Sequence, residues 1–446
     1  MMASLEGYSA NCYADTVVQA GVVRGHAMER ERSMLARNAV RGSLLLVVLG
    51  MMASASAVAP PRLASPRDFA VMAWDSSPSD PEQLRLMKEA GLNVSGFCAP
   101  QDVERVRAAG LACFVSDDRV SGYDWKKLPP DPDLRKNIAA AVHEVAGNPA
   151  VLGFYLRDEP HVSLLPGLGR VASILVGTLP GTWPYVNLFA VYGGRAYTGT
   201  DDYETYLRQF VETVRPPFIS YDDYALVEGE MRDVFYTNLE LVRRVSLEAK
   251  IPFWNCILAT AHYNYMEASD ATFNLQVYST LAYGGRGIEY FTYFTGTDGN
   301  QRLGPIDQFG NRTPTWDMLR RINYQIHALA PTLIRLHSTG VYHWADAPLD
   351  GHPLSESRLV QKIQVAAPSL RHPTEPRFLL GEFEDAQGRP YLMLVNKDLR
   401  QSFLFSIRLK QEGRKLLRIS SYTGDESGEG QDNWLAPGAG MLFRVE

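Results

Sequence analysis

The sequence predicts an α/β protein, a (β/α)8 or TIM barrel followed by a small carboxyl-terminal antiparallel β-sandwich. Short β-rich runs alternate with amphipathic stretches eight times between residues 68 and 337. These units occupy about 270 residues, close to the size of a typical barrel of this kind. An open doubly wound sheet is the alternative, but eight units and the lack of a glycine-rich phosphate loop favour the barrel.

The predicted strands are runs rich in β-branched and aromatic residues. The helical patterns between them end in Gly, Asn or Pro, the usual stop signals of a helix. A last helical pattern, residues 315–336, closes the ring. The predicted strands are 69–74, 92–97, 111–116, 151–156, 185–192, 217–221, 252–258 and 288–294.

Beyond residue 337 the pattern changes to short alternating runs, such as RFLLGEFED and SFLFSIRLK, separated by Gly, Pro and Asp. This pattern predicts an antiparallel sandwich. We therefore divide the chain into an amino-terminal extension with a signal peptide (1–57), a linker (58–67), a barrel (68–337) and an accessory β-sandwich (338–446).

The amino-terminal region carries the features of a secretory signal. Arg37 and Arg41 precede an apolar run at 44–52, and small residues follow up to Ala57. The run is about half of the roughly 20 residues that span a bilayer. We expect cleavage after Ala57, a secreted or periplasmic mature protein, and no stable membrane insertion once the signal is removed.

Composition excludes several classes of function. The 446 residues are 46% hydrophobic and carry a net charge of -6, which is typical of a globular protein and gives no reason to expect nucleic acid as a partner. The sequence has no Walker loop, dinucleotide fingerprint, HExxH motif or nucleophile elbow, so we expect no cofactor and no metal. Cys98, Cys113 and Cys256 lie in hydrophobic settings and are expected to be buried. The oligomeric state stays open.

Reactive groups of such barrels lie at the carboxyl ends of the strands. The fourth predicted strand, GFYLRDEPH, ends with Asp158 and Glu159, and Pro160 stops it. A carboxyl group held there beside aromatic rings can have its pKa raised enough to donate a proton near neutrality. The alternative is that the two acids cap the following helix, with Pro160 in its first turn.

The run GFYLRDEP resembles the fourth-strand signature of clan A glycoside hydrolases, the β-galactosidase and cellulase superfamily. In that clan Asn-Glu or a variant ends the strand, and the glutamate is the acid/base. The resemblance implies a carbohydrate substrate and a general acid/base role for Glu159.

The sequence departs from the clan at two points. Asp158 stands where Asn is usual. The clan places its nucleophile at the end of the seventh strand, where PFWNCILATAHYNY offers His262, Tyr263 and Tyr265 but no glutamate before Glu267. The second carboxylate must therefore come from elsewhere.

Glycoside hydrolysis normally needs two carboxyl groups, about 5 Å apart for retention and further apart for inversion. The sixth strand ends ISYDDYAL, and because side chains alternate in direction we predict that Asp222, rather than Asp223, faces the pocket as nucleophile or general base. The alternative is a turn-forming Asp-Asp pair. Glu289 begins the eighth strand and is expected toward the opposite, stability face, and Glu267 is expected to be a solvated loop acid.

Polar and aromatic residues at the other strand ends suit a sugar, which presents apolar faces and hydroxyl edges. Trp254 and Tyr155, within strands, are expected to be core residues. His262 is the best polar candidate, although a lone histidine is more often structural. The predicted substrate-binding residues are Trp74, Asp75, Asp158, Asn187, Tyr192, Tyr224, His262 and Tyr293.

These residues predict a secreted glycoside hydrolase that cleaves oligo- or polysaccharides. One alternative is a catalytically silent glycan-binding barrel. A distance of more than about 10 Å between the carboxyl groups of the two candidate acids would favour this alternative. Another resembles chitinase-like barrels, with Asp158 positioning an acetamido group and Glu159 protonating the leaving oxygen. A lyase for acidic polysaccharide would need a basic pocket, for which the sequence offers Arg157, Arg195 and His262.

Overall fold

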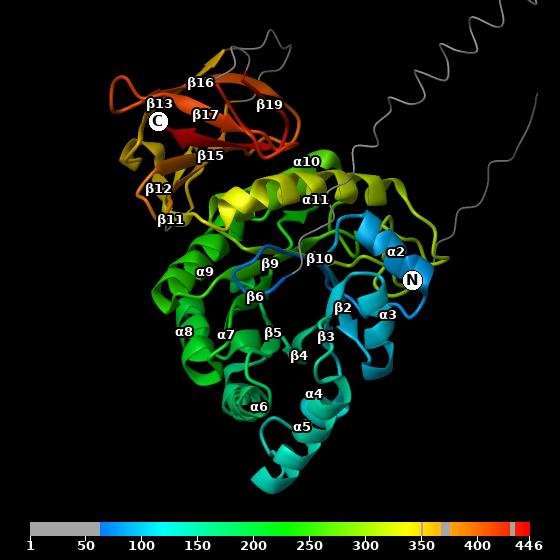
Figure 1. Cartoon of the computed structure of the whole chain (residues 1–446). Helices are drawn as coiled ribbons and strands as arrows, with labels where there is room; N and C mark the ends of the chain where they lie inside the picture. Colours follow the sequence, from blue (N-terminus) through cyan, green and yellow to red (C-terminus); the bar gives the residue numbers. More distant parts are fainter. Residues whose placement is uncertain (1–62, 349–350, 367–374, 429–432) are drawn as a thin grey trace, which may run out of the picture. The chain divides into compact units, whose positions relative to one another are not determined.

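The computed structural model describes residues 63–348, 351–366, 375–428 and 433–446. The predicted signal peptide and most of the linker lie outside these residues. Within the described ranges, eight parallel strands close into a barrel in the order β1-β10-β9-β6-β5-β4-β3-β2, and helices surround it (Figure 1). The predicted (β/α)8 barrel is confirmed.

Each barrel strand falls on a predicted run. The strands are β1 (Ala70–Ala73), β2 (Val94–Cys98), β3 (Ala112–Val115), β4 (Val151–Asp158), β5 (Trp183–Leu188), β6 (Ile219–Asp222), β9 (Phe253–Leu258) and β10 (Gly287–Phe291). The helices are α2 (Pro81–Glu89), α3 (Val103–Ala108), α4 (Asp118–Ser121), α5 (Asp131–Val145), α6 (Leu165–Thr178), α7 (Gly194–Thr198), α8 (Tyr203–Val214), α9 (Phe235–Ala249), α10 (Asp270–Ala282) and α11 (Pro314–Leu333). Short 3-10 turns are η1 (Pro100–Asp102), η2 (Val162–Leu164), η3 (Val191–Gly193) and η4 (Leu354–Glu356).

Two barrel strands, β5 and β10, end several residues before their predicted ends. After β5 the chain turns into η3, because the backbone N–H of Val191 donates to the Asn238 side chain on α9 at 2.6 Å instead of pairing with a strand. After β10 the carbonyl of Tyr293 accepts from the N–H of Ile306, in the loop before α11, at 3.0 Å. Tyr192 and Tyr293 therefore lie beyond the strands that were expected to carry them.

Several helices begin at the capping residues that the sequence supplies. The side chain of Asp80 accepts a backbone N–H at the start of α2, and Asp202 does the same at α8. Ser269 and Thr272 form a reciprocal capping box on α10, and Thr313 caps α11. These caps fix where each helix leaves the loop that follows a strand, and the same loops carry the mouth of the barrel.

The barrel interior is filled by aromatic rings. Phe114, Tyr185, Phe218 and Trp254 are almost fully buried there, and the rings of Phe218 and Trp254 stack with centroids 4.0 Å apart. A Cβ at Gly287 would lie 2.4 Å from Trp254, so this position on β10 accepts only glycine. The expected core role of Trp254 is confirmed. Because the interior is packed, the carboxyl-terminal mouth is where a ligand can bind.

The carboxyl-terminal residues form the predicted β-sandwich. Its larger sheet has the strand order β12-β11-β14-β15-β20-β17-β18 and its smaller sheet the order β13-β16-β19, among the described residues. Apolar side chains such as Leu380, Leu392 and Phe443 fill the space between the two sheets. The strands are β11 (His337–Trp344), β12 (His352–Pro353), β13 (Val360–Ala366), β14 (Phe378–Glu384), β15 (Pro390–Asn396), β16 (Phe403–Leu409), β17 (Leu416–Ile419), β18 (Glu426–Gly428), β19 (Trp434–Leu435) and β20 (Gly440–Val445).

The larger sheet is buried on both faces. Along β14, Leu380 faces the smaller sheet, whereas Leu379 and Phe383 belong to the apolar cluster that contains the barrel helices. A Cβ at Gly381 would lie 2.3 Å from the carbonyl oxygen of Ala282 on α10, so the sheet approaches that helix at backbone distance. Barrel and sandwich thus share one continuous core.

The three cysteines in the described ranges, Cys98, Cys113 and Cys256, are free and buried, as expected. None of the helices described here combines the length and apolar character needed to cross a lipid bilayer.

Candidate active site

Two carboxyl groups meet at the mouth of the barrel. Glu159 directly follows β4, and Asp222 is the last residue of β6. The backbone N–H of Glu159 donates to the carbonyl of Asn187 at 2.8 Å, and its φ of 42° lies in a region that residues other than glycine rarely adopt. The Glu159 carboxyl forms a hydrogen bond with the Asp222 carboxyl. Such a bond needs a proton on one of the two groups.

Asn187, on the intervening strand β5, holds two of the acids. Its Nδ2 donates to Oδ1 of Asp158 and to Oδ1 of Asp222, each at 3.2 Å. A β-bulge between Tyr155 and Arg157 shifts the register of β4, so that Asp158 pairs with Asn187. The amide therefore sets the spacing of the carboxyl groups on the neighbouring strands.

Burial raises the pKa of each of these acids. Burial, followed by the negative charge of Asp158, raises the pKa of Glu159 to about 7, although the hydrogen bond with Asp222 opposes the shift. Burial, followed by the charges of Glu159 and Asp158, raises the pKa of Asp222 well above its usual range. The pKa of Asp158 is also raised by burial. Three carboxyl groups so close together cannot all ionise near neutral pH, and the group titrates as a unit.

A fourth acid lies beneath the cluster. The carboxyl of Glu289 contacts Ser220 Oγ at 2.8 Å and accepts from the Tyr185 hydroxyl at 2.9 Å. Burial raises the pKa of Glu289 to about 8, so at neutral pH it can donate its proton to Ser220. Ser220 Oγ in turn donates to Oδ1 of Asn187 at 2.9 Å. This chain orients the amide so that its N–H groups face Asp158 and Asp222.

The expectation that Glu289 lies toward the stability face was wrong. β10 begins two residues earlier, at Gly287, and the Glu289 side chain points into the barrel below the cluster.

Aromatic rings line the mouth beside the acids. Tyr224 stacks on Phe291 with centroids 5.3 Å apart, and its ring meets His262 at 5.7 Å and Tyr265 at 5.4 Å. Nδ1 of His262 lies 3.0 Å from the carbonyl of Thr260, and burial lowers the pKa of the ring. His262 is therefore neutral at neutral pH, a state suited to hydrogen bonding.

Trp74 and Asp75 directly follow β1 at the same mouth. Trp74 packs edge-on against Phe97 at 5.1 Å, and Phe97 contacts Tyr155 at 4.4 Å. The indole Nε1 of Trp74 is buried and has no hydrogen-bond partner among the described residues. Burial raises the pKa of Asp75 to about 6, against hydrogen bonds from the backbone N–H groups of Ser76 and Phe294. Tyr155, expected in the core, is only partly buried.

The structure does not bring Tyr293 to the mouth. Its side chain is fully buried, and its hydroxyl accepts from Nε1 of Trp316 at 2.9 Å. Tyr293 therefore packs against α11, because the chain leaves the barrel after Phe291. Glu267 lies on the surface and forms an ion pair with Arg302 at 3.0 Å.

Tyr192, which the sequence predicted at the site, and Arg232, which it did not single out, complete the mouth. Tyr192, in η3, lies close enough to Asp222 and Asp223 for their charges to raise its pKa. Arg232 follows the hairpin β7 (Leu226–Val227) and β8 (Glu230–Met231) and stacks on Tyr192, with its guanidinium carbon 3.9 Å from the ring centroid. The only sequence signal for Asp223 was the Asp-Asp pair. Arg232 had no sequence signal, because it lies in an irregular insertion after β6.

Comparison with known proteins supports the fold. No protein-family model matches the sequence, and no curated protein does. A solved structure described as a glycoside hydrolase is 10% identical, with a TM-score of 0.51 over 84% of this chain and 92% of that chain. A glycoside hydrolase family 5 structure from Bacteroides vulgatus ATCC 8482 is 9% identical, with a TM-score of 0.49 over 85% and 88% of the two chains.

The β-galactosidase from the psychrophilic Marinomonas ef1 is 10% identical, with a TM-score of 0.48, and covers 61% of this chain. This chain spans 63% of that enzyme and 58% of the β-galactosidase from the haloarchaeon Halorubrum lacusprofundi, less than two thirds of each. At such identities the likeness concerns the fold. The chain has a TIM-barrel fold like that of the solved glycoside hydrolase structure with the TM-score of 0.51.

Proposed function

We propose that the protein is a glycoside hydrolase in which Glu159 is the general acid/base and Asp222 is the nucleophile or general base. The observation that carries the proposal is the hydrogen bond between these two carboxyl groups at the mouth of the barrel. Two acids that share a proton provide both the donor and the carboxylate that the cleavage of a glycosidic bond needs. Glu159 is the more exposed of the two, as befits the group that meets the leaving oxygen.

The substrate must separate the two acids. Carboxyl groups in hydrogen-bond contact are closer than the roughly 5 Å of retaining enzymes and the wider gap of inverting ones. When a sugar enters, Glu159 keeps the proton and donates it to the glycosidic oxygen, and Asp222 is left ionised below the anomeric carbon. Asn187 keeps Asp222 and Asp158 in place during this step, because it donates to both.

The aromatic residues and neutral groups around the dyad favour a carbohydrate. In the proposal Tyr224, Tyr192 and Trp74 offer ring faces and polar edges, and His262 and Asp75 offer hydrogen bonds to sugar hydroxyls. We also propose that the mature protein acts outside the cytoplasm, on the basis of the signal-like residues before Val58.

A glycan-binding barrel without catalysis is the second candidate. The end of β9 favours it, because Leu258 is followed by Ala259 and Thr260 where the clan keeps its nucleophile. Against it stands the contact between Glu159 and Asp222, since carboxyl groups far apart would be expected in a silent barrel.

The test is a screen of the purified full-length protein against aryl glycosides, including N-acetylated ones, and plant and algal polysaccharides. On any substrate found, Glu159→Gln should lower kcat by about 100- to 10,000-fold while thermal unfolding stays unchanged. The matched control is Glu267→Gln, an exposed loop acid, which should keep full activity. Unchanged activity of Glu159→Gln would remove the residue from the mechanism, and glycan binding without turnover would favour the silent barrel.

A further inference from the structure

Arg232 is a cation at the mouth of the barrel that forms no ion pair with any acid among the described residues. Its guanidinium carbon lies 3.9 Å from the ring centroid of Tyr192 and 5.7 Å from that of Tyr265, and its Nη2 donates to the Tyr265 hydroxyl at 3.3 Å. Its Nε is buried and has no hydrogen-bond partner within the described ranges. The guanidinium thus lies over the Tyr192 ring and is held by the Tyr265 hydroxyl.

The nearest buried acid does not neutralise this charge. Asp223 is fully buried, and neither of its carboxyl oxygens has a hydrogen-bond partner among the residues that the structure describes. Burial raises the pKa of Asp223 to about 7, although the charge of Arg232 opposes the shift. In mildly acidic solution Asp223 therefore holds a proton, and the guanidinium keeps its full positive charge.

Arg232 belongs to the same mouth as the two candidate catalytic acids. Tyr192 links Arg232 to these acids, because the guanidinium covers its ring and the charge of Asp222 contributes to the raised pKa of its hydroxyl. Tyr265 links them a second time, because its ring contacts Tyr224.

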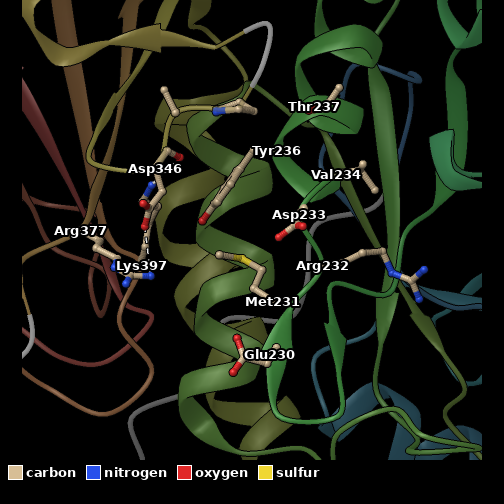
Figure 2. A pocket seen from close by; sticks show the side chains of 12 residues that line it. Glu230, Met231, Arg232, Asp233, Val234, Tyr236, Thr237, Asp346, Arg377 and Lys397 are labelled. Carbon is tan, nitrogen blue, oxygen red and sulfur yellow. Dashed lines mark hydrogen bonds and ion pairs between the residues drawn. The ribbon is translucent and has the colours of Figure 1, made fainter.

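A neighbouring cavity of about 660 Å³ holds other cations, Arg377 and Lys397. The Arg232 side chain extends away from both of them (Figure 2). Arg377 pairs with Asp346 at 3.0 Å, and Lys397 donates to the carbonyl of Ala345 at 2.8 Å. Arg232 also borders this cavity, but its guanidinium contacts Tyr192 and Tyr265 rather than the groups that hold Arg377 and Lys397.

We propose that Arg232 binds the carboxylate of an acidic sugar, so that the glycans taken at this mouth contain uronic acids. A guanidinium edge offers two parallel N–H donors that match the two oxygens of a carboxylate. Stacking on Tyr192 fixes the plane of that edge before the ligand arrives. A neutral sugar would leave the charge partly desolvated and unpaired, which is unfavourable.

This inference rests on the proposed carbohydrate site, and its test does not require turnover. The full-length Glu159→Gln protein is titrated calorimetrically with 4-nitrophenyl glucuronides and galacturonides of both anomers, and with the corresponding glucosides and galactosides. The uronides should bind more tightly, and the preference should weaken as NaCl is raised. Adding Arg232→Gln should lower the ratio of uronide to neutral affinity by about 10- to 100-fold.

Two further variants sharpen the result. Arg232→Lys keeps the charge but loses the two-donor edge, so it should recover only part of the preference. Arg195→Gln is the matched control, because Arg195 is an exposed arginine after β5 that already pairs with Asp201 at 2.9 Å, and the ratio should not change. Thermal unfolding of each variant shows whether it is folded.

The outcomes separate this inference from the proposed hydrolase. Failure of every uronide to bind, or an unchanged ratio in both Arg232 variants, overturns the inference. If the wild-type protein cleaves no glycoside but uronide binding depends on Arg232, the hydrolase fails and the acidic-sugar site stands. If neutral glycosides are cleaved with no preference for uronides, the hydrolase stands and the acidic-sugar site fails.

Discussion

Glu159 and Asp222 share a hydrogen bond even though their strands, β4 and β6, are not neighbours in the barrel. The intervening strand supplies Asn187, which donates to Asp222 and to Asp158. A single amide thus ties the ends of three consecutive strands into one acidic cluster. The cluster titrates as a unit, and several of the predictions below follow from that coupling.

Replacing Asp222 should abolish turnover and reveal its role. Asp222→Ala removes the partner carboxylate, so kcat should fall by about 1,000-fold or more, as for other essential groups. If Asp222 is the nucleophile, added azide should enter the space and restore turnover, giving a glycosyl azide of inverted configuration. The product is identified by NMR. An Asp222→Asn protein with wild-type kcat would exclude the residue from the reaction.

Replacing Asp158 should move the pH profile. The pKa of Glu159 is raised to about 7, so kcat/KM should fall as pH rises through that value and the acid loses its proton. The charge of Asp158 contributes to this shift. Asp158→Asn keeps the shape but removes the charge, so the alkaline limb should move to lower pH by up to about one unit. A limb that stays in place would show that another group sets it.

Asn187 acts through the acids that it holds, so it is a positioning residue. Asn187→Ala should lower kcat by about 10- to 100-fold with a smaller change in KM, because Asp222 and Asp158 lose a shared donor. The pH profile should also change, since the spacing of the acids sets their pKa values. Asn264→Ala, on an exposed loop, is the control. Lower thermal stability with unchanged kcat and pH profile would indicate a purely structural role.

Asp223 makes stability depend on pH. Its pKa is raised from the ordinary value of 3.8 to about 7 in the folded protein, so between these values the folded state holds a proton that the unfolded chain releases. Stability should therefore fall as pH rises from about 4 to 7. Asp223→Asn should flatten this dependence by on the order of 3 kcal/mol between pH 4 and pH 8. Urea unfolding at both pH values measures it, and Asp118→Asn, at an exposed site, should leave the slope unchanged.

The amino terminus of the mature protein is a separate prediction. When the full chain is expressed in a Gram-negative host, the protein should appear in the periplasm or medium with Val58 as its first residue. Intact-mass spectrometry and amino-terminal sequencing check this. Arg37→Glu together with Arg41→Glu should reduce export, because the positive charge before the apolar run is lost. Cytoplasmic protein that retains residues 34–57 would contradict the prediction.

Much of the fold could be predicted because local patterns agree with the architecture. The barrel strands follow apolar β-rich runs, and helices begin at capping residues such as Asp80 and Ser269. The strand ends were harder. The bulge beside Tyr155, which aligns Asp158 with Asn187, arises from pairing between β4 and β5, and no local sequence pattern predicted it. The exit of the chain before Tyr293 depends on a bond to a distant loop.

The chemistry of the site was only partly visible in the sequence. The acids at 158, 159 and 222 were found because motif and strand position coincide. Arg232 was not found, because it lies in a hairpin insertion with no periodic pattern, and it reaches the mouth through contacts with Tyr192 and Tyr265. Glu289 was misplaced because the sequence put it at the start of its strand, whereas β10 begins at Gly287 and Glu289 lies in the middle of it.

The close approach of β14 to α10 limits how this chain can be engineered. With Gly381 at backbone distance from Ala282, the last strands complete the coat of the barrel helices. A truncation at residue 337 would expose a broad apolar surface on α10 and leave the isolated barrel prone to precipitation. Crystallisation, domain swaps and library designs should therefore treat residues 63 to 446 as one indivisible piece.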